Sequence, residues 1–184
     1  MKAVQPKILT YDDYLALPET KQRYEIIDGE LIWRCPAPTI KHQRVVKKAC
    51  VKLDPFVEEN DLGELILSPV DVVVSRNPLR MRQPDLLFVR KERLSIVQER
   101  VEGAPDLVIE VLSPGNARPS VLEKLSDYAR IGVRECWIFS PEALTLEVLV
   151  LNRGRYKRLG LFGSGDRIRS QVWPQLSLTV DDLL

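Results

Sequence analysis

The chain has 184 residues, a length that suits one hydrophobic core and is short for two. Apolar residues make up 45% of the sequence and charged residues 29%, the proportions of an ordinary globular protein. With 27 basic and 26 acidic residues the formal net charge is +1, which excludes a whole-molecule field that draws the protein to nucleic acid or membrane; any nucleic-acid affinity must come from a local basic patch.

Cysteine and histidine are too few and too widely spaced for several kinds of site. The three cysteines, Cys35, Cys50 and Cys136, are an odd number without a CxxC pair, which argues against a disulfide framework and against zinc. His42 is the single histidine, so a histidine-rich metal site within one chain is excluded. The N-terminal residues lack the apolar run of a signal peptide and no segment approaches membrane-spanning length, so we expect a cytoplasmic protein.

The predicted elements begin with a helix and a hairpin. Thr10 is placed to cap a short helix over 11–17. The run 24–33 predicts two strands around Asp28-Gly29, because both residues of an Asp-Gly pair tolerate a positive φ. From 40 to about 57, apolar residues recur at steps of three and four, which predicts a helix with one buried face.

Strands dominate the rest of the chain. The segment 106–112 is nearly unbroken in aliphatic residues, as expected of a strand covered on both faces. Gly132 ends a helix predicted from about 119 to 131. Further strands are predicted over 64–67, 70–74, 80–89, 135–139, 144–151 and 156–161, and Thr179 is placed to cap a last turn. This order predicts an α/β fold, one domain over 1–184 with a mixed β-sheet flanked by helices.

Glu110 is the anomaly in this pattern. Strand alternation places it in the middle of the aliphatic strand, where an unpaired carboxylate is costly and needs a metal ion, a lysine or water beside it. Asp85 is a second acid, at the start of the strand-like run 85–89. Two carboxylates on neighbouring strands are the hard oxygen ligands that Mg²⁺ takes, and such an ion polarises a phosphodiester and activates the attacking water.

Lys124 is the third candidate. On the helix that follows the Glu110 strand, it lies at the edge of an apolar stripe that includes Val121 and Tyr128, whereas Glu123 and Asp127 are expected to point away. A lysine in that position buries its stem and brings its ammonium inward. Near developing phosphate charge it would position the water or stabilise the transition state.

These residues lie within a longer pattern that resembles the Uma-two family. The resemblance spans roughly 10–150, with a motif core over 24–140, and the block 105–138 is its most specific part. It is carried by Tyr24-Glu-Ile-Ile-Asp-Gly-Glu-Leu31, His42, Gln83-Pro-Asp85, Pro105-Asp-Leu-Val-Ile-Glu-Val-Leu-Ser-Pro114, Glu123-Lys124, Tyr128-Ala-Arg-Ile-Gly-Val133 and Glu135-Cys-Trp-Ile138.

That family is assigned to the PD-(D/E)XK superfamily of metal-dependent nucleases, which have a restriction-endonuclease-like fold. The resemblance implies Asp85 as the motif aspartate, Glu110 as the motif acid, and Mg²⁺ or Mn²⁺ as the cofactor at these two residues. It also implies a nucleic acid, DNA, as the substrate. Because cutting a duplex takes two sites, it further implies a homodimer.

The sequence departs from the superfamily pattern at several positions. The motif lysine is expected at 112, which is leucine here, and Lys124 on the next helix is the candidate replacement. Ser120 stands where relatives often carry aspartate, and Cys136 and Ser140 replace a common tyrosine and aspartate. Because serine at position 120 replaces an acid, a nuclease-like domain without catalysis remains an alternative hypothesis.

Other polar residues have both structural and functional interpretations. His42 is either a hydrogen-bonded core residue or a site-lining group, and Glu30 is either an exposed strand charge or a residue facing the cleft. Asp106 lies roughly 13 Å along the strand from Glu110 at about 3.3 Å per residue, and we interpret it as structural. The basic run 76–82 is either a solvated face or a phosphate track leading to Asp85. The tryptophans Trp33, Trp137 and Trp173 are predicted to lie in the core.

Three hypotheses follow. The first is metal-dependent hydrolysis of DNA phosphodiester bonds by an endonuclease, with Asp85 and Glu110 on the metal, Lys124 on the water, and His42 or Glu30 shaping the cleft. The alternative is a catalytically inactive nuclease-like domain that serves nucleic-acid binding or protein interaction. The third is a purely structural ion pair between Glu110 and Lys124 in a domain of unrelated function.

Overall fold

The computed structural model describes residues 8–18, 24–33, 38–113 and 118–184, so Cys35 and Pro114 lie outside the described residues. Three α-helices and two 3₁₀ helices are found there: α1 Tyr11–Leu15, α2 Ile40–Glu59, α3 Arg118–Ile131, η1 Lys91–Ile96 and η2 Val180–Asp182. The strands are β1 Tyr24–Ile27, β2 Glu30–Trp33, β3 Gly63–Leu67, β4 Val72–Arg76, β5 Leu79–Arg82, β6 Leu86–Arg90, β7 Leu107–Val111, β8 Glu135–Ser140, β9 Thr145–Asn152 and β10 Arg155–Phe162. None of the described helices is long and apolar enough to cross a membrane.

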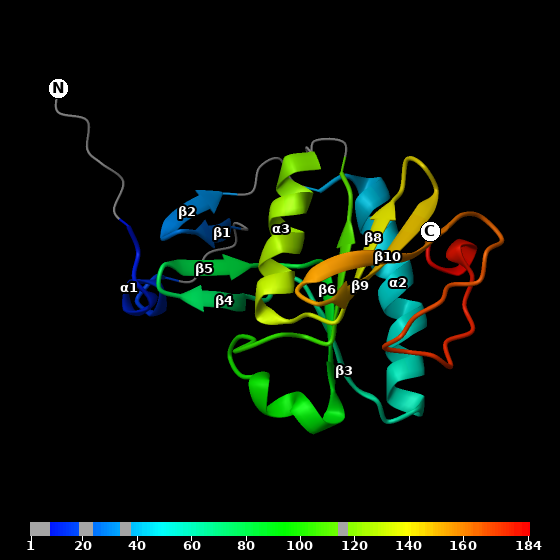
Figure 1. Cartoon of the computed structure of the whole chain (residues 1–184), viewed down its shortest axis with the longest axis horizontal. Helices are drawn as coiled ribbons and strands as arrows, with labels where there is room; N and C mark the ends of the chain where they lie inside the picture. Colours follow the sequence, from blue (N-terminus) through cyan, green and yellow to red (C-terminus); the bar gives the residue numbers. More distant parts are fainter. Residues whose placement is uncertain (1–7, 19–23, 34–37, 114–117) are drawn as a thin grey trace.

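The strands form two sheets (Figure 1). The larger sheet has the order β10-β9-β8-β7-β6-β3, and the smaller has the order β2-β1-β5-β4. Within the larger sheet β7 and β8 are parallel, connected through α3, and the other pairs are antiparallel. The α/β class and the mixed sheet predicted from the sequence are confirmed, but the second sheet was not predicted.

Helices cover both faces of the larger sheet, which is why β7 is buried along its whole length. Leu107, Ile109 and Val111 belong to the apolar cluster that includes α2, whereas Val108 belongs to the cluster that includes Tyr128 of α3. Because side chains alternate along a strand, Glu110 shares the face of Val108 and points toward α3. The packing of β7 therefore places an acid beneath a helix.

The hairpin β1–β2 turns as its sequence predicts. Asp28 and Gly29 have φ angles of +52° and +79°, and four cross-strand pairs follow from Tyr24↔Trp33 to Ile27↔Glu30. On the other side of β1, Ile26 pairs with Met81 of β5. The hairpin thus enters the small sheet beside β5, which sets its polar residues near α3.

Two sequence predictions are wrong. The single strand expected over 80–89 is two strands, β5 and β6, in different sheets, and the chain crosses between them through Gln83-Pro84-Asp85. The division depends on which strands lie alongside each half of the segment, and the sequence of the segment does not show this. Trp137 and Trp173 are buried as predicted, but Trp33 is 50% exposed at the end of the edge strand β2.

Candidate active site

Asp85 and Glu110 come from adjacent antiparallel strands of the larger sheet. Leu86 pairs with Ile109, which sets Asp85, just before β6, at the level of Glu110 in β7. The amide of Val111 donates a hydrogen bond to Oδ2 of Asp85 over 2.9 Å, so the backbone of β7 itself holds the aspartate. Both carboxylates are more than nine-tenths buried.

His42 orients Asp85 from the opposite helix. Its Nε2 lies 3.2 Å from Oδ2 of Asp85, and Thr39 caps the first turn of α2 by accepting from the His42 amide. The described residues offer no partner for Nδ1 of His42, which is consistent with Nε2 being the nitrogen that carries the proton toward Asp85. Burial acts to raise the pKa of Asp85, but the hydrogen bond and charge of His42 and the Val111 amide outweigh it, so the pKa lies below its usual value.

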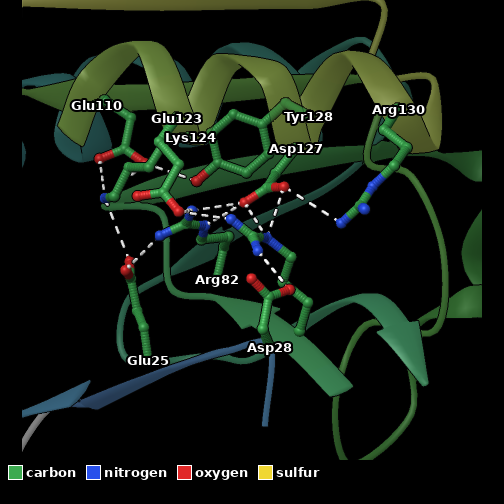
Figure 2. Close-up of polar contacts among 10 residues, drawn as sticks. Glu25, Asp28, Arg82, Glu110, Glu123, Lys124, Asp127, Tyr128 and Arg130 are labelled. Atoms are coloured by element: carbon green, nitrogen blue, oxygen red, sulfur yellow. Dashed lines mark hydrogen bonds and ion pairs between the residues drawn. The ribbon is translucent and has the colours of Figure 1, made fainter. Parts of the chain in front are cut away.

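Glu110 is held from α3 by two side chains one helical turn apart. Nζ of Lys124 lies 2.9 Å and 2.7 Å from the two carboxylate oxygens, and the Tyr128 hydroxyl donates to Oε1 over 2.6 Å (Figure 2). Burial raises the pKa of Glu110, with the Asp85 charge in support and Lys124 opposed. Burial lowers the pKa of Lys124, but the charges of Glu110 and Glu25 outweigh it and leave that pKa above its usual value.

Glu25 of β1 is the second carboxylate on Lys124. Its Oε1 lies 3.5 Å from Nζ, and its Oε2 accepts from Nη1 of Arg82 over 2.9 Å (Figure 2). Glu25 is 2% exposed and Arg82 is fully buried. The small sheet therefore contributes a buried acid to the site, a residue that the sequence reasoning missed.

A further ion network continues from Arg82 along α3. Asp127 accepts from Nε of both Arg80 and Arg82, over 2.8 and 2.6 Å, and Glu123 accepts from Nη2 of Arg80 over 2.5 Å. Asp28 in the hairpin turn binds Arg80 from the other side. The prediction that Glu123 and Asp127 point away from the site is wrong, because buried arginines of β5 draw them inward.

The basic run 76–82 is accordingly neither a solvated face nor a phosphate track at its C-terminal end. Arg80 and Arg82 are buried and neutralised by acids of α3 and the hairpin. Arg76 is the exposed member and pairs with Glu102.

Glu30 lies apart from the other predicted site residues. It pairs with Ile27 across the hairpin, which places it on the sheet face of Glu25, but its side chain is exposed. No hydrogen bond or ion pair joins it to Asp85, Glu110, Lys124 or His42 within the described part of the chain. The structure thus brings together four of the five predicted residues, and the hairpin contributes Glu25 rather than Glu30 to the contacts of Lys124.

Comparison with known proteins decides the family. The model of the Uma2 family, described as "Putative restriction endonuclease", matches residues 11–181. The chain belongs to the Uma2 family. A crystal structure of "a putative nuclease belonging to DUF820" from Anabaena variabilis matches with a TM-score of 0.76 and 21% identity over 95% of this chain and 97% of that chain, which shows a shared fold. A search of curated proteins finds no match.

The donor set of this Uma2 protein fits a hard divalent cation in chemical type. Asp85 and Glu110 supply carboxylate oxygens from adjacent strands, and their charges act on each other. Among the residues that the structure describes, no group of three or more His, Cys, Asp or Glu side chains is arranged to hold a metal. Two carboxylates completed by water and substrate phosphate are nevertheless the usual protein contribution to Mg²⁺.

In this Uma2 chain Asp106 makes structural contacts, as the sequence predicted. It is fully buried, accepts from the Arg90 amide over 3.1 Å, and pairs with Arg93 over 2.9 Å. Arg134 approaches it at 3.8 Å. These contacts tie η1 and the start of β8 to the N-terminal end of β7, away from Glu110.

Proposed function

We propose that the protein is a metal-dependent endonuclease that hydrolyses phosphodiester bonds of DNA. The observation that carries the proposal is the meeting of Asp85 and Glu110 from adjacent strands, with Lys124 on Glu110. Membership of the Uma2 family supports nuclease function in general. Metal dependence, the DNA substrate and the roles of single residues are our inference from the site.

Asp85 and Glu110 would hold Mg²⁺ or Mn²⁺, which supplies a Lewis acid for the phosphate and lowers the pKa of the attacking water. His42 keeps the Asp85 carboxylate oriented and charged. Lys124 brings a cationic donor to the place where negative charge develops on the phosphate. Glu30, exposed on the sheet face of Glu25, would border the site and contact substrate rather than metal.

The second candidate is a nuclease-like domain without catalysis, in which Glu110 and Lys124 form a structural ion pair. It is favoured by the two short contacts that Lys124 makes with both oxygens of Glu110. The Lys124 side chain is 17% exposed, so the pair is not sealed from solvent, and we rank this candidate second.

The test is cleavage of supercoiled plasmid, linear duplex and single-stranded RNA with Mg²⁺, Mn²⁺ or chelator. We expect metal-dependent nicking of DNA by wild type and a loss of about 100-fold or more in Asp85→Asn and Glu110→Gln, since a catalytic metal is worth several kcal/mol. Glu147→Gln, which removes an acid of β9 that pairs with Arg158 and lies two strands from β7, is the control and keeps full activity. Activity that survives both site substitutions refutes the mechanism, and binding without cleavage supports the second candidate.

We further propose that the active form is a cytoplasmic homodimer, because cleavage of both strands of a duplex takes two sites. Sedimentation equilibrium at micromolar concentration, with and without duplex, is the measurement. If the protein is a monomer both with and without duplex and still makes double-strand breaks in a single encounter, the homodimer proposal is wrong.

A further inference from the structure

The ammonium of Lys124 lies between two buried carboxylates of different strands. It contacts both oxygens of Glu110 at 2.7 and 2.9 Å and stands 3.5 Å from Oε1 of Glu25 (Figure 2). Charge-assisted N–H···O bonds have lengths of about 2.7–2.9 Å, so the Glu25 contact is an ion pair short of a full hydrogen bond. Lys124 is therefore bound to one acid and lies within about an ångström of the bonding distance of a second.

Glu25 is fixed in that position by contacts that do not involve Lys124. Its other oxygen accepts from Nη1 of Arg82 at 2.9 Å, and Nε of Arg82 donates to Asp127 at 2.6 Å. Arg82 is fully buried and Glu25 is 2% exposed, so breaking this pair would leave a buried charge without its partner. The oxygen that faces Lys124 is thus presented by a buried ion pair.

We propose that Glu25 is an alternative acceptor for the Lys124 ammonium, which moves from Glu110 to Glu25 when a divalent cation binds Asp85 and Glu110. The inference rests on the proposed function, since it needs the metal site. Glu25 acts as a positioning residue: it keeps Lys124 paired and within the site while Glu110 is engaged elsewhere.

The argument is one of competition for the same oxygens. While Lys124 contacts both oxygens of Glu110, a divalent cation on that carboxylate meets a like charge at close range. A lysine displaced without a partner would be a buried, uncompensated charge, which is strongly unfavourable. Glu25 removes that penalty, because a small movement of the flexible Lys124 side chain brings its ammonium to the Glu25 carboxylate. Glu25 therefore sets how readily the site binds the cation.

The direct test is a pair of crystal structures of the full chain, without and with Mn²⁺. We expect the Nζ–Glu25 distance to fall from 3.5 Å to about 2.8 Å with Mn²⁺ bound, and Nζ to leave at least one oxygen of Glu110. Mn²⁺ on Asp85 and Glu110 with both Lys124–Glu110 contacts retained overturns the inference and leaves the proposed function standing. Absence of Mn²⁺ from these two acids overturns both.

Calorimetric Mn²⁺ titration of Glu25→Gln, Lys124→Met and the double variant supplies an independent measurement. We expect Glu25→Gln to weaken Mn²⁺ binding about tenfold in the presence of Lys124, within the coupling known for contacting groups, and to change it much less in the Lys124→Met background. Glu147→Gln, an acid of β9 that pairs with Arg158, is the control and leaves the affinity within about twofold. An equal or larger effect of Glu25→Gln without Lys124 indicates direct attraction of the cation and overturns the inference.

Discussion

At the scale of single residues, the surroundings of the two site acids shift their pKa values in opposite directions. Asp85 has its pKa lowered by His42 and the Val111 amide against the effect of burial, whereas burial raises the pKa of Glu110 against the effect of Lys124. Environments that push the pKa values of neighbouring titratable groups apart are typical of catalytic pairs. The surroundings of Asp85 thus favour its charged form, whereas the burial of Glu110 opposes its charged form and Lys124 favours it.

The lowered pKa of Asp85 predicts how stability changes with pH. Between the folded pKa of Asp85 and its unfolded value of about 3.9, the unfolded chain binds more protons, so the contribution of Asp85 to stability is full above that window and is lost as pH falls through the folded pKa. We therefore expect the stability difference between wild type and Asp85→Asn, from urea unfolding, to shrink as pH is lowered. A difference that grows toward acid pH contradicts the assigned direction.

Sequence reasoning could anticipate where Glu110 and Lys124 lie from the strand and the helix that carry them, whereas their roles in the site stay predictions. Glu110 was predicted because an acid interrupts an aliphatic strand, and Lys124 because it borders an apolar stripe. Glu25 was missed because β1 is only four residues long, and its burial depends on α3 and β5, which lie far away in the sequence. The signal that could have found it is the alternation that groups Glu25 with Ile27 on one face of the hairpin.

At the scale of elements, α3 is attached to the small sheet by buried ion pairs, in addition to the apolar cluster that Tyr128 shares with Val72 of β4. Asp127, 4% exposed, accepts from two arginines of β5, and Arg80 extends the connection to the Asp28 turn. The same helix carries Lys124 and Tyr128 to Glu110 on its other flank. The position of α3, and with it the geometry at Glu110, therefore depends on Asp127.

Asp127→Ala leaves two buried guanidinium groups without their shared acceptor. We expect a loss of about 3–5 kcal/mol in the free energy of unfolding, the range for breaking a buried ion pair from one side. Urea unfolding monitored by circular dichroism measures it. Glu142→Gln, in the exposed pair with Lys41, is the control and changes stability by about 1 kcal/mol or less. If Asp127→Ala changes the free energy of unfolding as little as this control does, the network does not stabilise the fold as proposed.

Element boundaries were predictable where local chemistry marks them. The Asp28-Gly29 turn, the helix α2 and the buried strand β7 appear in the structure close to their predicted limits. The division of 80–89 between two sheets was not predictable, because it depends on which strands lie alongside and not on the residues of the segment. For the same reason, no pattern in the sequence pairs Arg80 and Arg82 with Asp127.

At the scale of the whole molecule, three apolar clusters hold the fold together. Two lie on opposite faces of the larger sheet, under α2 and α3, and the third, which includes Tyr14, Ile26 and Met81, belongs to the small sheet. The small sheet is joined to the rest by the ion network, by Val72 of β4 in the apolar cluster under α3, and by the short link from β5 to β6. These connections are buried, so the two sheets are coupled.

We therefore expect a single unfolding transition in urea. The fluorescence transitions of wild type and of Trp33→Phe, which lacks the tryptophan of the small sheet, should coincide with each other and with the circular dichroism transition. An early fluorescence phase present in wild type and absent from Trp33→Phe would show that the small sheet unfolds independently.

The crossing between the sheets spans only Gln83, Pro84 and Asp85, with Arg82 before it and Leu86 after it. Arg82 is anchored in the small sheet by Glu25, and Leu86 is fixed in register with Ile109 in the larger one. One inserted residue would have to displace either the arginine from its acids or the aspartate from β7. Insertional scanning of the gene should therefore show that this tripeptide does not tolerate insertions or deletions. The turn at 141–144 between β8 and β9 should tolerate them.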